Sequence, residues 1–250
     1  MLFADAAPDV YVLAGQSNMS GRGAITDLHL RDRIADPRIR LYGNDGQWRT
    51  ALDPLDDATG QIDTVSADKQ AAVGPGLPFA RAMRRTATHP IALVPCAKGG
   101  TSIGRWKPAQ DRATLYGSCV ARVREAGGHL AGLLWYQGES DAEKSLGEAL
   151  GWTAAFVEMA GAFRHDLGVA KLPIVIVQIA DSPRTDPDGY PSWRRIQAQQ
   201  VRSPLPCSAI VSTRGLARNP DDLHLTTGAQ QRLGPKLAAA MAGLIRRGCR

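Results

Sequence analysis

Long hydrophobic runs, clustered basic residues and a leader-like opening are all missing from this sequence of 250 residues. No apolar stretch approaches the roughly 20 residues that a membrane-spanning helix needs, so no membrane partner is expected. The 30 Lys and Arg residues exceed the 24 Asp and Glu residues, but they are scattered along the chain. This distribution favours a solvated basic surface, and we expect no nucleic-acid partner.

Patterns typical of export and of metal binding are equally scarce. Met1–Pro8 contains no basic segment followed by an apolar one, so we expect either a cytoplasmic protein or a secreted one whose signal has been removed. The four cysteines, at 96, 119, 207 and 249, form no CxxC pair, and the five histidines show no metal-ligand spacing, so no metal is expected. A disulfide between Cys96 and Cys119 stays open, because sequence does not define their separation. The oligomeric state is also undefined.

What the sequence does contain is an alternation of short apolar runs with helical stretches, which predicts an α/β domain with a mostly parallel sheet of about five strands. The candidate strands are 10–14, 39–42, 91–95, 130–136, 173–179 and 209–212. The candidate helices are 77–86, 115–126, 150–166, 193–201 and 226–246. The polar segment 44–74 is too long for an idle connection, so we expect it to form a wall of a substrate cleft. With no repeat or linker, residues 1–250 are expected to form a single domain.

Polar groups that follow the strands are where a parallel sheet binds its ligands. Ser17 lies in a strand-to-helix turn that would expose its hydroxyl, which suits a nucleophile. His224 is the best candidate for its general base, and Asp221, three residues earlier, could orient the imidazole ring. Asp222 is the rival partner, but its side chain is expected to point away.

A tetrahedral oxyanion at such a site needs hydrogen-bond donors. We expect them to be the backbone N–H groups of Ser17 and Gly100 and the side-chain amide of Gln137. Gly99 is an alternative to Gly100, because the sequence does not say which amide points inward. Each of these residues alone has an ordinary structural interpretation, and only their joint occurrence in order favours catalysis.

At these residues the sequence resembles a known family, the sialate O-acetylesterase and acetylxylan esterase group (carbohydrate esterase family six) of the SGNH hydrolases. Four blocks in order carry the resemblance: 15–21 (GQSNMSG), 99–103 (GGTSI), 135–141 (WYQGESD) and 221–225 (DDLHL). The resemblance implies a three-layer, flavodoxin-like α/β/α fold, a Ser-His-Asp triad and release of acetate from acetylated sugars without cofactor or metal. The Gly-Asp-Ser-Leu form of the first block is absent, which disfavours long-chain lipid substrates.

Carried over to this chain, the resemblance makes Ser17 the nucleophile, His224 the base and Asp221 the orienting acid. Gln137 stands where the wider superfamily has Asn. Gln16, Asn18 and Glu139 are expected to support the loop around Ser17, and possible substrate contacts are Trp48, Arg105 and Trp106.

The expected partner is an acetylated oligo- or polysaccharide, with an acetylxylan esterase-like activity as the leading hypothesis. An esterase of another small acyl ester, such as sialate O-acetyl groups, and a catalytically silent sugar-binding module are the alternatives.

Overall fold

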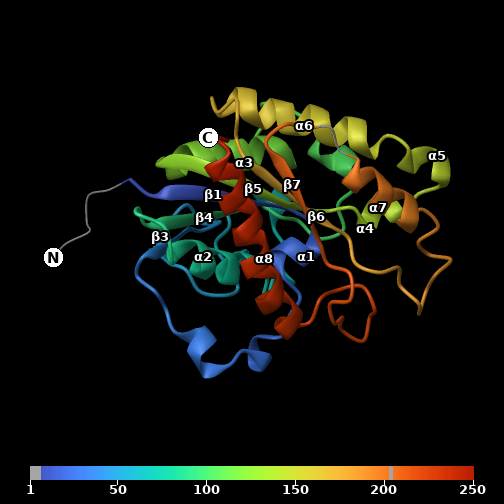
Figure 1. Cartoon of the computed structure of the whole chain (residues 1–250), viewed down its shortest axis with the longest axis horizontal. Helices are drawn as coiled ribbons and strands as arrows, with labels where there is room; N and C mark the ends of the chain where they lie inside the picture. The colour runs from blue at the N-terminus through green and yellow to red at the C-terminus, as the bar shows by residue number, and fades with distance from the viewer. Residues whose placement is uncertain (1–6, 203–204) are drawn as a thin grey trace.

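The computed structural model describes residues 7–202 and 205–250, in which one twisted sheet lies between two layers of helices (Figure 1). Residues 1–6, where no signal peptide is expected, lie outside the described part. The sheet order is β3-β2-β4-β1-β5-β6-β7. Neighbouring strands are parallel except β2 and β3, which form an antiparallel hairpin. The strands are β1 (Asp9–Gly15), β2 (Ile39–Tyr42), β3 (Trp48–Thr50), β4 (Ile91–Pro95), β5 (His129–Tyr136), β6 (Ile174–Gln178) and β7 (Ser208–Ser212).

Helices α2 and α8 pack against each other on one face, while α3 and α6 cover the other (Figure 1). The helices are α1 (Ser17–Ser20), α2 (Gly76–Arg84), α3 (Leu115–Ala126), α4 (Glu139–Ala142), α5 (Leu146–Ala149), α6 (Trp152–Asp166), α7 (Trp193–Val201) and α8 (Thr227–Arg246). Short 3-10 turns lie at Ile25–Asp27, Leu30–Arg33, Thr64–Ser66 and Ile103–Trp106. The side chain of Thr226 caps α8 by accepting a hydrogen bond from the backbone N–H of Ala229.

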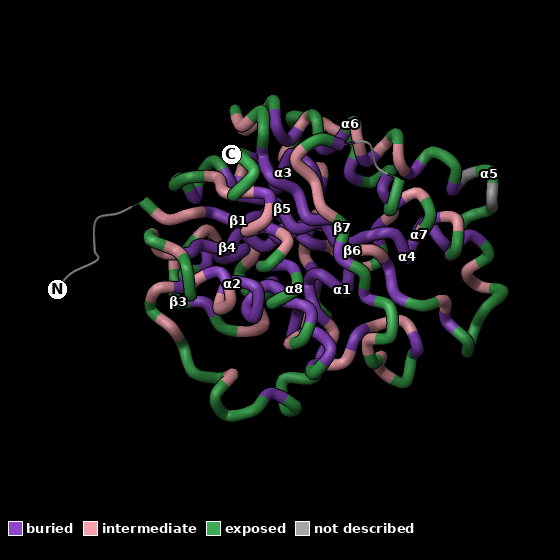
Figure 2. The backbone as a smooth tube through the Cα atoms, in the orientation of Figure 1, coloured by how far each residue is buried: buried purple, intermediate pink, exposed green. Residues whose placement is uncertain are grey.

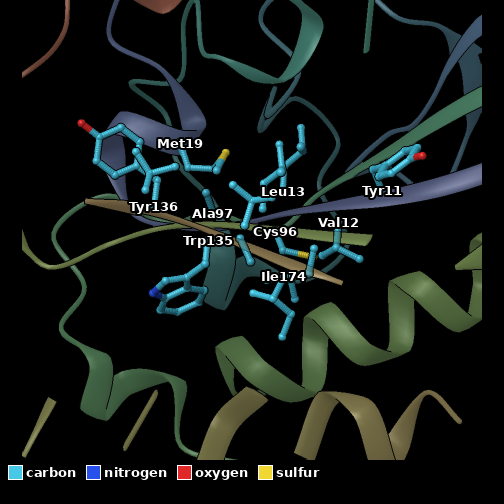
Figure 3. Packing of buried hydrophobic residues seen from close by; sticks show 14 of the residues in the cluster. Tyr11, Val12, Leu13, Met19, Cys96, Ala97, Trp135, Tyr136 and Ile174 are labelled. Carbon is cyan, nitrogen blue, oxygen red and sulfur yellow. The ribbon is translucent and has the colours of Figure 1, made fainter. Parts of the chain in front are cut away.

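The core lies on both sides of β1, the central strand, because successive side chains of a strand point to opposite faces. Tyr11 and Leu13 point toward one helical layer and Val12 toward the other (Figure 3). Tyr11 contacts Phe79 of α2, whereas Trp135 of β5 contacts Phe156 of α6 on the opposite face. A strand covered on both faces is apolar throughout, which is why the first apolar run of the sequence predicts it well. Figure 2 shows this buried centre against an exposed periphery.

Two disulfides link helices to the sheet. Cys96, just after β4, bonds to Cys119 of α3, and Cys207, just before β7, bonds to Cys249 beyond α8. The first pair was left open by the sequence, and the second was not anticipated, because the two residues approach only after α8 has packed beside β7.

The predicted α/β class and parallel sheet are confirmed, but the sheet has seven strands where about five were expected. The sixth apolar run does form β7, and the hairpin strand β3 was missed because its three residues form no apolar run. Within the described residues, no helix combines the length and the apolar character that crossing a membrane requires.

Candidate active site

Ser17 lies where the chain leaves β1, and the turn that presents it depends on Gly15. Gly15 has a φ of 132°, and a Cβ atom there would lie 2.1 Å from the carbonyl oxygen of Tyr136. Gln16 is extended, and α1 then begins at Ser17. Only 5% of Ser17 is exposed, so its hydroxyl group is held at the floor of a cavity rather than on an open surface.

The imidazole ring of His224 lies between Ser17 and Asp221. Its Nε2 is 2.9 Å from Ser17 Oγ, and its Nδ1 is 2.8 Å from Asp221 Oδ2. The other carboxylate oxygen of Asp221 accepts the backbone N–H groups of Leu223 and His224, each at 2.9 Å. With Nδ1–H donating to Asp221, Nε2 of the neutral ring is left to accept the Ser17 hydroxyl proton. Residues 207 positions apart thus meet as the sequence predicts.

The carboxyl group of Asp221 stays ionised in this arrangement. Partial burial raises its pKa, but the hydrogen bonds from His224 and Leu223 outweigh burial and hold the pKa below its usual value. Asp222 points away, as expected: it forms an ion pair with Arg218 at 2.8 Å and accepts the backbone N–H of Arg184. Asp221 is therefore the carboxylate that faces His224.

Asn18 and Glu139 connect Ser17 to the loop that carries His224. Asn18 Nδ2 donates to Glu139 Oε1 at 2.7 Å, and Asn18 Oδ1 accepts the backbone N–H of Leu225 at 2.9 Å. Asn18 Nδ2 also lies 3.3 Å from the carbonyl oxygen of Leu223. Burial raises the pKa of Glu139, with the Asn18 hydrogen bond opposing it. These contacts match the supporting position expected of both residues.

Gly99 and Gly100 are distinguished by their hydrogen bonds. The N–H of Gly99 donates to Asp68 Oδ2 at 2.8 Å and is therefore not free to face a substrate. Within the described part of the chain, neither the N–H of Gly100 nor that of Ser17 donates to a backbone or side-chain acceptor, and both residues line the same cavity. Gly100 has a φ of 70°, which suits a glycine. Of the two alternatives, the geometry favours Gly100.

The expectation that Gln137 offers its amide to an oxyanion is wrong for this structure. Its side chain is fully buried, and Nε2 donates to the carbonyl oxygen of Thr101 at 3.0 Å, to Gln16 Oε1 at 3.2 Å and to Asp141. Its Oε1 accepts from Trp152 Nε1 at 2.9 Å. An amide nitrogen has two hydrogens, so three acceptors leave none for a ligand. The sequence block locates Gln137 beside the site but does not reveal which way its amide is turned.

The three expected substrate contacts are not near Ser17 either. Trp106 is fully buried, where its ring packs edge-on against Trp135 and its Nε1 donates to Thr101 Oγ1. Trp48 lies on β3, at the edge of the sheet, where its ring contacts the tilted ring of Tyr42 and the guanidinium of Arg40. Arg105 is exposed on the turn Ile103–Trp106 and does not line the Ser17 cavity. The sequence placed these three residues in or beside loops expected to lie near the cleft. In the structure their side chains face the core or another surface.

The cavity over Ser17 has a volume of about 770 Å³. Part of its lining comes from the predicted wall segment 44–74, and we find no aromatic side chain among its described lining residues. Those from the wall are Thr64, Ala67, Asp68, Lys69 and Gln70. The expectation that this polar loop faces the cleft is therefore confirmed.

Sequence reasoning missed Asp68 and Arg22, which join the wall to the Ser17 loop. Arg22 Nη2 lies 2.9 Å from Asp68 Oδ2, and that oxygen also accepts Ser20 Oγ–H at 2.8 Å. Burial raises the pKa of Asp68, but the hydrogen bonds and charge of Arg22, together with the hydrogen bonds from Ser20 and Gly99, outweigh burial and hold the pKa below its usual value. Arg22 directly follows the first sequence block, and this position was the only available signal.

A grouping of ligand atoms able to hold a metal ion lies at the opposite end of the sheet. The side chains of Asp9, His89 and His129 place one potential ligand atom each within 4.8 Å of one another. Asp9 begins β1 and His129 begins β5, whereas Ser17 follows the far end of β1. This group is separate from the Ser17 cavity and supplies nothing to it.

Comparison with known proteins gives a consistent result. Residues 7–243 match a family model described as carbohydrate esterase, sialic acid-specific acetylesterase. A protein named "probable carbohydrate esterase" from Arabidopsis thaliana is 35% identical over 248 residues, which cover 92% of this chain and 89% of that protein.

Solved structures agree. An Arabidopsis thaliana structure is similar with a TM-score of 0.82 and 33% identity, covering 95% of this chain and 98% of that one. NanS has a TM-score of 0.71 at 19% identity, covering 97% and 99% of the two chains. A carbohydrate acetylesterase from Xanthomonas citri has a TM-score of 0.68 at 22% identity, covering 94% of this chain and 56% of that one. The last two indicate the shared fold alone.

Proposed function

The chain belongs to the sialic acid-specific acetylesterase family of carbohydrate esterases, and from this premise we propose that Ser17, His224 and Asp221 hydrolyse acetyl esters of sugars through an acetyl-enzyme. As a member of this family the chain is a carboxylic ester hydrolase. The observation that carries the proposal is the continuous contact from Ser17 Oγ through the His224 ring to Asp221, at 2.9 Å and 2.8 Å.

In the first half-reaction Ser17 Oγ attacks the acetyl carbonyl carbon while His224 Nε2 takes the hydroxyl proton. The carbonyl π bond becomes an oxyanion, which the N–H groups of Ser17 and Gly100 stabilise. When the oxyanion collapses, the bond to the sugar oxygen breaks, and His224 returns the proton to that oxygen. The sugar leaves with a free hydroxyl group, and Ser17 retains the acetyl group.

In the second half-reaction a water molecule replaces the sugar. His224 removes a proton from the water as its oxygen attacks the acetyl carbonyl. When the second tetrahedral intermediate collapses, the bond to Ser17 Oγ breaks, His224 returns the proton to Oγ, and acetic acid leaves and ionises to acetate. The negative charge of Asp221 stabilises the imidazolium ring in both half-reactions, because the pKa of Asp221 lies below its usual value. The partial exposure of His224 gives the water access to this step.

The observations identify the type of reaction more sharply than they identify the substrate sugar. An acetylxylan-like substrate was the leading expectation, but Trp48, Arg105 and Trp106, which would have bound it, do not line the cavity. The family description favours O-acetylated sialic acid as a second candidate substrate. The two disulfides favour an oxidising compartment as the site of action.

The test is acetate release from acetylated xylo-oligosaccharide, O-acetylated sialic acid and an aryl acetate. We expect Ser17→Ala to lower kcat by about 10³-fold or more, since it removes the nucleophile. Ser182→Ala, at a surface away from the Ser17 cavity, is the matched control and should retain wild-type rates.

Four outcomes distinguish the hypotheses. Serine-dependent release from one glycan supports the proposal and identifies the sugar. Cleavage of the aryl acetate alone keeps the triad and rejects both sugars. Retained turnover by Ser17→Ala rejects the mechanism, and a silent wild-type protein that binds acetylated glycan supports the sugar-binding module.

A further inference from the structure

The side chains of Asp9, His89 and His129 meet at the end of the sheet where β1 begins. In the parallel pairing, Asp9 lies opposite His129 of β5 and opposite Ile91 of β4, and His89 is two residues before Ile91. Neighbouring parallel strands begin at the same edge of a sheet, so three residues that are far apart in the chain come together there. Because no two of them are close in sequence, their spacing shows no metal-binding pattern, and the sequence alone predicts no metal.

The distances between these side chains suit a single ion. One potential ligand atom from each of Asp9, His89 and His129 lies within 4.8 Å of the other two. Nδ1 of His89 is 3.4 Å from Asp9 Oδ1, which is long for a hydrogen bond to a charged acceptor. Two ligands on a tetrahedral zinc ion, each at roughly 2.1 Å from it, are about 3.4 Å apart. His89 and Asp9 therefore already have the separation that a shared ion requires.

The two imidazole rings do not hold each other in another arrangement. Their centroids are 5.8 Å apart and their planes are tilted by 47°, so the rings do not stack face to face. The side chain of His89 is 43% exposed and His129 is also exposed, so both rings can rotate toward an ion. A modest rotation of His129 is enough to complete the set of three ligands.

The backbone that carries these ligands is held in place before any ion binds. The N–H of Asp9 donates to the carbonyl oxygen of Pro90 at 2.9 Å, and the N–H of His129 donates to that of Pro8 at 2.9 Å. Binding therefore orders side chains only, which lowers the entropy that the site loses when it takes up an ion.

The three ligands border a cavity of about 370 Å³. Ile245, in the last turn of α8, lines this cavity, and the C-terminus of a helix carries a partial negative charge that favours a cation. Among the described lining residues Arg250 is the only Lys or Arg, and its charge opposes a second cation. Because these charges act in opposite directions, the ion that binds here must be one that imidazole nitrogen ligates strongly.

We propose that Asp9, His89 and His129 form a zinc site. Two imidazole nitrogens and one carboxylate oxygen are ligands typical of Zn²⁺, whereas Ca²⁺ and Mg²⁺ take oxygen ligands. Three protein ligands leave the fourth tetrahedral position to water. The ion links the starts of β1 and β5 to the segment before β4.

This site is independent of the reaction at Ser17. Asp9 and Gly15 are the two ends of β1, a length of about 20 Å at the rise of an extended strand. The proposal therefore does not rest on the proposed function, and it is tested by metal binding rather than by turnover.

Calorimetric titration of the full chain with zinc chloride, after removal of metals with a chelator, tests the site. We expect one zinc ion per chain, bound at least about 10²-fold more weakly by His89→Ala and by His129→Ala, because losing an outer-shell partner alone already costs up to about 100-fold. Magnesium chloride should produce no binding heat.

His165→Ala is the matched control. His165 also lies beside a carboxylate, with its Nδ1 2.9 Å from Asp166 Oδ1, but within the described residues no third ligand joins that pair. This variant should bind zinc with wild-type affinity. Equal affinities of all three histidine variants would show an adventitious ion only and would overturn the proposal, as would a wild-type protein that binds no zinc.

Thermal unfolding provides a second test. An ion that binds the folded chain stabilises it by mass action, so zinc at a hundredfold excess over its Kd should raise the wild-type Tm by about 5 °C or more. The Tm of His89→Ala should rise much less at the same zinc concentration. An equal rise in both proteins would contradict the assignment.

A measurement on the wild-type protein avoids any dependence on how the variants fold. In side-chain ¹⁵N–¹H spectra, one equivalent of zinc should shift the imidazole signals of His89 and His129 and leave those of His165 and His224 unchanged. Shifts confined to other histidines would overturn the proposal.

Discussion

The two sides of Ser17 differ in how far they are sealed from solvent. On one side, Gln16, Gln137 and Glu139 are each at most 2% exposed and are fixed by hydrogen bonds. On the other side, the side chain of Asp221 is 48% exposed and that of His224 is 19% exposed. The sealed side can hold donors in place against a developing charge, and the open side can exchange protons, water and sugar.

This contrast follows from topology. The sealed residues leave β1 and β5, which are neighbours in the centre of the sheet and are covered by helices on both faces. Asp221 and His224 belong to the loop before α8, which reaches the site from outside and is tied to it through Asn18. We therefore expect substitutions on the two sides to have different effects. Those on the open side should impair the chemical step alone, whereas those on the sealed side should also displace catalytic groups.

The largest effect after loss of Ser17 is expected on the open side. Asp221→Asn should lower kcat by about 10²- to 10⁴-fold, because an amide cannot provide the charge that stabilises the imidazolium and favours the wrong ring tautomer. The half-exposed position of Asp221 predicts little change in Tm. Rate measurements beside thermal unfolding check both parts, and Asp222→Asn serves as the control for the neighbouring carboxylate. A large fall in Tm with unchanged kcat would reverse the assignment.

A smaller effect is expected where the cavity wall meets the sealed side. Asp68→Ala removes the acceptor of the Gly99 N–H and the partner of Arg22, which should let the Gly100 N–H drift from the oxyanion. We expect kcat to fall by about tenfold to 10²-fold, the range that small misplacements of catalytic groups cost. Asp57→Ala, exposed on the same wall segment, is the control. Equal activity of the two variants would show that Asp68 does not position the glycine.

The smallest effect concerns stability alone and lies away from Ser17. Burial raises the pKa of Asp56 to about 7, with the hydrogen bond from Asn44 opposing it, and Asp56 Oδ2 has no partner in the described structure. Because the folded pKa lies above the unfolded one, the contribution of Asp56 to stability is fully present below about pH 4. It is lost as pH rises through about 7.

As pH rises from about 4 to 7, the Tm of the wild-type protein should therefore fall by several degrees more than the Tm of Asp56→Asn. Asp57→Asn is the matched control next to it and should keep the wild-type pH profile. Identical profiles for the Asp56 and Asp57 variants would show that Asp56 does not titrate near neutrality in the folded protein.

The sequence predicts most of the fold because each central strand is covered on both faces, and such strands are continuously apolar. The roles of Ser17, His224 and Asp221 could also be predicted from the sequence. Each residue lies in a short block whose position after a strand or before a helix limits where its side chain can lie. The sequence does not reveal amide orientation. Whether Gln16 or Gln137 faces the cavity depends on backbone N–H groups of Gly138 and Ser140 that turn inward only in the folded loop.

The prediction of the substrate contacts was wrong for a related reason. Trp106 follows a polar block and was expected to contact the substrate, yet its ring is fully buried and packs edge-on against Trp135 of β5. A tryptophan six residues beyond a glycine turn has the same local sequence pattern whether it binds a sugar or packs in the core. Tertiary contacts with Trp135 decide between these outcomes, and they are not visible in the local sequence.

The central claim is that Ser17 becomes acetylated during turnover, and the most direct test is to trap that intermediate. The wild-type protein would be mixed with an aryl acetate, quenched in acid within milliseconds and examined by intact-mass and peptide mass spectrometry. The account predicts one added acetyl group, located on Ser17, that appears before steady state and is absent from Ser17→Ala. An acetyl group on another residue, or catalytic turnover by Ser17→Ala, would contradict it.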